Sequence, residues 1–192
     1  MKKKELLALA DYMELVDAAA YDQSSWLDRL KPDKILGIDQ ETGAVRLSED
    51  FCGTSACVLG HAVFAPALKH LGLFLNLRPS FSSERESDTV TIDGTRYLCR
   101  YPEICTVDDD GHVVEGFETA CIAFDIPEDH AEVIFGPNTA DTRFFYLGEE
   151  GSPDDLTPTV VASALRDYVA TNGERFERNW DLYLEWANRV DD

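Results

Sequence analysis

The fold of this chain depends on the stretch Phe51-Cys-Gly-Thr-Ser-Ala-Cys-Val-Leu-Gly-His-Ala-Val-Phe64. It gathers small residues, two cysteines and a histidine at what the pattern predicts to be the start of a helix. Thr54 or Ser55 is a good N-cap, and the residues from Ala56 to Phe64 favour a helix. We expect the helix to break near Ala65 and the other elements to pack around it.

Outward from this stretch, the hydrophobic period predicts helices on both sides and strands between them. Apolar residues at steps of three and four predict helices over residues 3–20, 127–136, 157–171 and 174–190. A period of two, with turn residues between the runs, predicts hairpins over residues 34–47, 89–101 and 104–115, and a further strand over residues 120–126. We therefore expect an α+β fold, in which a small, mainly antiparallel sheet over residues 89–126 packs with the N-terminal, cysteine-motif and C-terminal helices.

Length and composition bound the class of protein. A chain of 192 residues that is 44% hydrophobic can fill the core of one domain, and we find no linker that divides it. Its apolar runs are far shorter than a membrane span requires. Five cysteines without the dense spacing of a secreted scaffold favour reduced thiols. These observations predict a single-domain cytoplasmic protein that does not enter membranes, and its oligomeric state stays open.

Charge is unevenly distributed along the chain. Residues 1–100 carry 12 basic and 15 acidic side chains, a net −3, whereas residues 101–192 carry 5 and 22, a net −17. Such a field repels nucleic acid and favours basic protein partners, so direct nucleic-acid binding is excluded. An alternative explanation of the negative charge is an ordinary solvated surface in an organism whose proteins are generally acidic. The acidic residues that we assign to an interaction surface are Asp108, Asp109, Asp110, Glu149, Glu150, Asp154 and Asp155.

The cysteine stretch could carry chemistry of its own. If residues 56–64 are helical, Cys57 and His61 lie on one face within reach of each other. Cys52 precedes the helix, where the dipole lowers a thiol pKa and where Thr54 and Ser55 could help to hold a ligand. These residues are candidates for a nucleophile and base, or for ligand binding. The alternative is packing, because cysteine is among the most buried residue types.

Metal and cofactor signatures are weak. Cys52, Cys57 and His61 depart from the short ligand spacings of structural zinc sites. The run from Asp108 to His112 has no bidentate glutamate at the twelfth position of a calcium loop, so it is interpreted as an acidic hairpin tip. The sequence therefore predicts no metal and no cofactor.

The cysteine stretch resembles a family of uncharacterised bacterial and phage proteins. Their signature reads Cys-Gly-Thr-x-x-Cys-x-x-Gly-(His or Trp)-Ala, matched here from Cys52 to Ala62, with a Phe-Gly helix end downstream that is matched at Phe135 and Gly136. The resemblance covers roughly residues 6–137. The family has no settled activity, and its acceptance of Trp at the position of His61 implies packing or binding instead of base catalysis.

Two functions follow from the sequence. The leading hypothesis is a non-enzymatic, acidic interaction protein that occupies a basic, nucleic-acid-binding surface of a host protein. The resemblance to phage proteins implies that a phage encodes it. The alternative is an enzyme or small-ligand binder that uses the Cys/His site at the start of the helix over residues 54–65.

Overall fold

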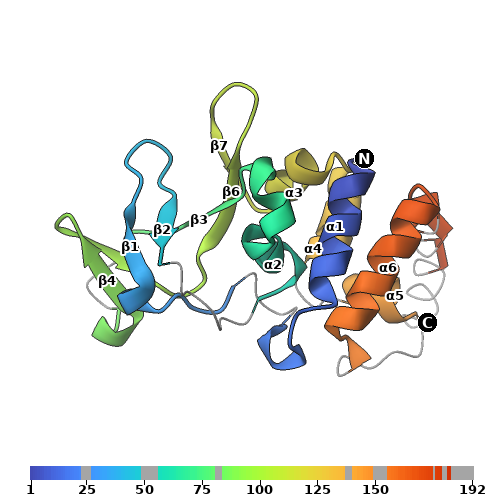
Figure 1. Cartoon of the computed structure of the whole chain (residues 1–192), viewed down its shortest axis with the longest axis horizontal. Helices are drawn as coiled ribbons and strands as arrows, with labels where there is room; N and C mark the ends of the chain where they lie inside the picture. The colour runs from blue at the N-terminus through green and yellow to red at the C-terminus, as the bar shows by residue number, and fades with distance from the viewer. Residues whose placement is uncertain are drawn as a thin grey trace, which may run out of the picture.

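The computed structural model describes residues 1–22, 27–48, 56–80, 84–136, 140–148, 155–174, 176–178 and 181–182. Its helices gather at one end of the molecule and most of its strands at the other (Figure 1). The fold is α+β with small antiparallel sheets, as the sequence predicts. In these ranges no helix combines the length and the apolar character that crossing a bilayer requires.

The helical half is built around α1 and α6, which pack along each other (Figure 1). α1 contributes a buried stripe of Leu6, Leu9 and Met13, at the spacing of one helix face. On the surface Arg166 of α6 bonds Asp11 of α1 at 2.7 Å. The α-helices are α1 (Lys3–Met13), α2 (Val58–Phe64), α3 (Phe117–Phe124), α4 (Glu128–Phe135), α5 (Ala140–Leu147) and α6 (Pro158–Ala170).

Local signals in the sequence set several helix ends. The Thr157 hydroxyl accepts a hydrogen bond from the backbone N–H of Val160, and Pro158 occupies the first turn of α6. α2 ends at Phe64 and Ala65 is extended, which confirms the expected break near Ala65, and a 3-10 helix begins at Pro66. The short 3-10 helices are η1 (Ala18–Ala20), η2 (Pro32–Lys34), η3 (Pro66–Leu71) and η4 (Glu86–Asp88).

Within the described ranges the strands form three separate small sheets. The three predicted hairpins are confirmed as β1–β2, β4–β5 and β6–β7. β3 adds to β6, which gives the order β3-β6-β7, while β1–β2 and β4–β5 are two-stranded. The strands are β1 (Ile35–Ile38), β2 (Val45–Leu47), β3 (Phe74–Asn76), β4 (Thr89–Ile92), β5 (Thr95–Leu98), β6 (Glu103–Val107) and β7 (Val113–Glu115).

Two expectations about the sheet are wrong. The hairpins do not join into one sheet, and the strand expected over residues 120–126 is largely the helix α3. Gly116, at φ +71°, turns the chain into α3, and Asp125, at φ +52°, ends it. A short apolar run fits a buried strand and a buried helix equally well, and here the run forms a helix that packs against α4 and β6.

The helix expected over residues 3–20 is shorter than predicted. α1 ends at Met13, and a 3-10 turn over Ala18–Ala20 follows it. Most of the helix expected over residues 174–190 lies outside the described residues. The Thr139–Leu147 segment, which has no clear sequence pattern, contains α5, whose Tyr146 hydroxyl donates to the Ile134 carbonyl at 2.6 Å.

Candidate functional site

Residues from the N-terminal part of the chain bury the start of α2. Ala56 forms bridges with both Tyr21 and Leu27, and its N–H donates to the Ala20 carbonyl at 3.2 Å. The expected N-cap at Thr54 or Ser55 is wrong, because α2 begins at Val58 and Cys57 occupies the N-cap position. Cys57 has 1% of its surface exposed and lies one turn from His61, which is 6% exposed. Cys52, Thr54 and Ser55 lie outside the described residues.

His61 ties α2 to the turn that precedes it. Its Nε2 lies 3.0 Å from the Ala20 carbonyl, so the neutral ring carries its proton on Nε2 and donates it. The ring stacks on Tyr21 with centroids 6.3 Å apart. Burial lowers the pKa of His61, because it disfavours the charged imidazolium. This geometry makes His61 a packing and hydrogen-bonding residue.

Cys57 has the environment of a structural thiol. Burial raises its pKa to about 11, which outweighs the hydrogen bonds from the backbone at the helix start. Cys99 and Cys105 are also buried, and burial raises the pKa of each thiol to about 11. The geometry therefore gives Cys57 no support as a nucleophile at neutral pH.

We expect alkylation to rank these thiols by their environment. At pH 8 about one thiol in a thousand with a pKa near 11 is ionised, against roughly one in four at the ordinary value. With iodoacetamide, Cys57, Cys99 and Cys105 should react at least ~100-fold more slowly in the folded protein than in urea, and half-buried Cys121 should react faster than those three. Peptide mass spectrometry reads each site separately, and equal rates at Cys57 with and without urea would contradict the assignment.

His61→Gln should flatten the pH dependence of stability on the acid side. The folded pKa of His61 lies below its unfolded value of about 6.5, so between the two values the unfolded chain binds more protons. The unfolding free energy therefore falls as pH drops below about 6.5, by at most ~1.4 kcal/mol per pH unit. Glutamine keeps a donor for the Ala20 carbonyl without titrating. Urea unfolding at pH 7 and pH 5 should show a smaller loss in the variant, and parallel losses would contradict the role.

A second group of polar residues lies at the tip of the β6–β7 hairpin. The Asp108 carboxylate accepts the backbone N–H groups of His112 at 2.7 Å and Asp110 at 3.0 Å, and Gly111 adopts φ +87°. These hydrogen bonds lower the pKa of Asp108, so it stays ionised. Asp109 and Asp110 are exposed, which leaves their charges at the tip.

Carboxylates from α3 and α4 extend the charge of the tip. Asp108, Asp109, Asp110, Asp125 and Cys121 line a shallow hollow of about 570 Å³, with Lys2 and Ile122 at the same rim. Burial raises the pKa of Cys121, and nearby carboxylates of the two helices raise it further. The structure thus brings together a set that we name the acidic surface: Asp108, Asp109, Asp110, Glu118, Asp125, Glu128 and Asp129.

The acidic surface differs from the sequence expectation in its members. The tip residues belong to it, but Asp155 lies ahead of α6 and is not among the residues that line the hollow. Glu149, Glu150 and Asp154 lie outside the described residues. The sequence pattern did not lead us to predict the other four members, Glu118, Asp125, Glu128 and Asp129. The absence of Lys and Arg from residue 101 to residue 142 is a signal that could have indicated them.

One group in the described chain could reach a metal ion. Ligand atoms of Asp108, Asp110 and His112 lie within 4.8 Å of one another at the exposed tip. The Asp108 carboxylate already accepts backbone N–H groups and faces His112 Nδ1 at 3.5 Å. Since these contacts account for the arrangement, the group is an ordinary acidic turn.

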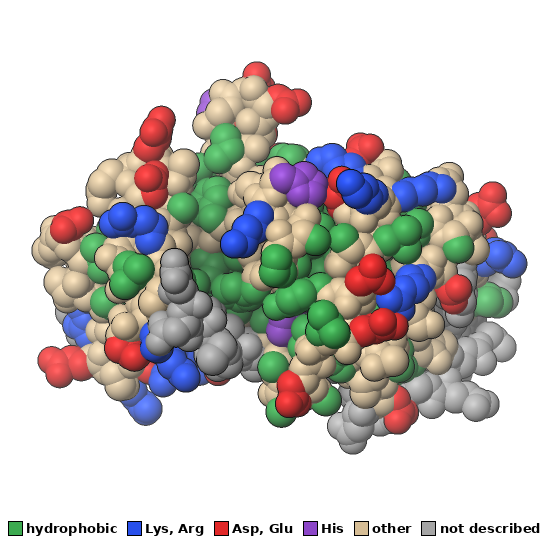
Figure 2. Space-filling model, in the orientation of Figure 1, with side chains coloured by type: hydrophobic (Ala, Val, Ile, Leu, Met, Phe, Trp, Pro, Cys, Tyr) green, Lys and Arg blue, Asp and Glu red, His purple; other side chains and the backbone are tan. Residues whose placement is uncertain are grey.

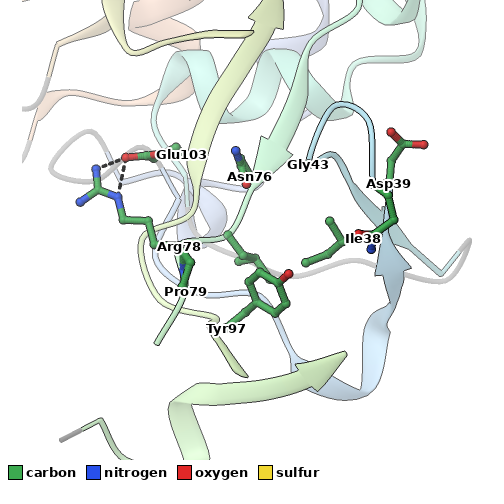
Figure 3. A pocket seen from close by; sticks show the side chains of 10 residues that line it. Ile38, Asp39, Gly43, Asn76, Arg78, Pro79, Tyr97 and Glu103 are labelled. Atoms are coloured by element: carbon green, nitrogen blue, oxygen red, sulfur yellow. Dashed lines mark hydrogen bonds and ion pairs between the residues drawn. The ribbon is translucent and has the colours of Figure 1, made fainter. Parts of the chain in front are cut away.

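A separate cleft lies between the β1–β2 turn and the neighbouring strands (Figure 3). It measures about 330 Å³, near the lower limit for a small-molecule site. Arg78 and Glu103 form an ion pair on one side, and Asp39 lies on the opposite side (Figure 3). Gly43, at φ +75°, approaches Asn76 so closely that a Cβ would lie 3.3 Å from its amide. The cleft is suited to a small polar ligand, and no sequence motif predicts it.

Comparison of the chain with known protein families, with characterised proteins and with solved structures finds no match. The resemblance of residues 6–137 to the Cys-Gly-Thr family therefore stays a prediction.

Proposed function

We propose that this protein is a non-enzymatic interaction protein whose acidic surface binds a basic protein partner. The observation that carries the proposal is the convergence of the β6–β7 tip with α3 and α4, in a part of the chain that has no Lys or Arg between residues 101 and 142. The Asp125 carboxylate is ion-paired with the N-terminal amine of Met1, and the other exposed carboxylates attract a surface rich in Lys and Arg.

The class of partner follows from the charge. A protein surface that binds a nucleic-acid backbone is lined with Lys and Arg, and a dense set of carboxylates competes for the same side chains. The protein would then act as an inhibitor that occupies such a surface. In the phage setting that the resemblance implies, the partner is a protein of the host.

A competition assay tests the proposal. The probe is a linker histone bound to a fluorescent 20-base-pair duplex, and the protein should release the duplex at 50 mM salt and much less effectively at 200 mM. A site variant carries Asp109→Lys, Asp110→Lys, Glu118→Lys and Glu128→Lys, and leaves Asp108 to hold the turn. We expect it to compete about 100-fold less well, since charge pairs at an interface can contribute several kcal/mol.

A matched control separates the surface from net charge. It carries four equivalent changes at exposed acids elsewhere, namely Asp33→Lys, Glu41→Lys, Glu86→Lys and Glu174→Lys. The control should compete within about threefold of the original protein, because rim and remote charges act weakly through screened solvent. Equal losses in both variants, or no release of the duplex at 50 mM salt, would overturn the proposal.

A further inference from the structure

The β6–β7 hairpin carries an apolar pair directly beneath its acidic tip. Val107 and Val113 are register partners, and their side chains are 39% and 43% exposed. Figure 2 shows hydrophobic side chains on the projecting hairpin next to the acidic ones. Isolated exposed valines are common, but two on opposed positions form one small apolar surface.

The hydrogen-bond pattern defines how this pair is arranged. The Asp108 N–H donates to the His112 carbonyl at 2.9 Å, and the Gly116 N–H donates to the Ile104 carbonyl at 3.3 Å. Bonded and non-bonded pairs alternate along an antiparallel ladder, so the Val107–Val113 pair is non-bonded. Side chains of such a pair approach most closely, which makes the two valines a continuous contact surface.

Among the residues that the structure describes, the same alternation leaves a strand edge without a partner strand. In a non-bonded pair the backbone N–H and C=O groups point away from the partner strand. On β7 these residues are Val113 and Glu115. β7 is the terminal strand in the order β3-β6-β7, so these groups point to the outer edge of the sheet. Such an edge can add a strand from another chain.

We propose that the hairpin anchors the basic partner by pairing the edge of β7 with a strand in which basic and apolar residues alternate. This proposal rests on the proposed function and specifies the partner segment. The apolar residues of that strand contact Val113 and so extend the apolar surface of the Val107–Val113 pair, while its Lys or Arg residues meet the acidic surface. An apolar centre within a charged rim is the usual arrangement of an interface, and a surface that imitated phosphates alone would gain nothing from exposed valines.

Two synthetic peptides of equal length and charge test the pairing. One alternates lysine with valine and the other alternates lysine with threonine, so both favour strands and only one is apolar. By fluorescence anisotropy at 150 mM salt, we expect the protein to bind the valine peptide about 10-fold more tightly. In the variant Val107→Thr/Val113→Thr the preference should fall below about twofold, since threonine keeps the β-branched shape without the apolar surface.

Further variants and outcomes keep the two proposals distinct. Leu36→Thr alters another exposed apolar side chain, 65% exposed on β1, and should keep the preference for the valine peptide. Thermal melting checks that the double variant is folded. Equal binding of both peptides by the original protein, or an unchanged preference in a folded double variant, overturns the strand proposal and leaves the charge-based function standing. If neither peptide binds at 50 mM salt, the proposed function fails as well.

Discussion

Phe135→Ala is expected to lower the free energy of unfolding by about 3–5 kcal/mol, the largest effect of any substitution considered. Phe135 is fully buried at the end of α4, and its ring stacks on Phe124 of α3 with centroids 5.2 Å apart. Alanine removes the ring from both helices and leaves a cavity. Because domains of this kind are stable by only about 5–15 kcal/mol, a large fraction of the variant should unfold in mild denaturant.

Urea unfolding followed by circular dichroism measures this effect. Phe135→Leu is the matched control, since it keeps most of the apolar volume and should cost less than about 1.5 kcal/mol if the site repacks. Similar midpoints for the alanine variant and the original protein would show that the α3–α4 contact contributes little to the core.

Gly136→Ala is expected to cost about 3 kcal/mol, near the upper end for steric overpacking. A Cβ at this position would lie 2.1 Å from the backbone carbonyl oxygen of Glu132, one turn earlier in α4. Backbone cannot move aside as a flexible side chain does, so the end of α4 has to shift. The Thr142 hydroxyl, 3.4 Å from the same Cβ position, limits that shift.

Gly94→Ala provides the comparison for a glycine without steric contacts. Gly94 is at the β4–β5 tip with φ +82°, and a Cβ there meets no atom within 4 Å. Its substitution should cost only about 1 kcal/mol, from backbone conformation alone. If differential scanning calorimetry gave the two variants equal melting temperatures, the close approach at Gly136 would not be a determinant of stability.

The hairpins and several helix ends could be predicted because their signals are local. Asp93 and Gly94 both adopt positive φ, which the two-residue turn between β4 and β5 requires and which Asp-Gly favours. Thr157 and Pro158 likewise mark the start of α6 without reference to the rest of the chain. Such features depend on a few consecutive residues, so the sequence contains them in full.

Local signals could not predict which hairpins share a sheet or which residues form the acidic surface. Residues 117–124 form a helix that packs against β6 and α4, and these contacts between distant parts of the chain exist only in the folded protein. The position of α3 in turn decides that Asp125 lies beside the tip of a hairpin and that Glu118 lies near Cys121 of the same hollow. Net charge indicated an acidic region, but its shape is a tertiary property.

The cysteine motif shows the same limit for a candidate site. Helical spacing places Cys57 and His61 on one face, and the structure buries both residues together with the whole first turn of α2. The groups that bury it, Ala20 and Tyr21, come from about 40 residues earlier in the chain. The same pattern of reactive residue types can therefore line a cleft or lie in a core. Only the tertiary contacts around these residues decide between the two.

The packing of α1 on α6 has a consequence for synthesis. Arg166 and Asp11, which meet across this contact, are 155 positions apart in the chain. At about 5–20 residues per second, the ribosome needs roughly 8–30 s after α1 emerges to deliver its partner. During that time the Leu6, Leu9 and Met13 stripe has no α6 to cover it. The helical half therefore closes late, and a chain interrupted before Pro158 presents an apolar helix face to chaperones and proteases.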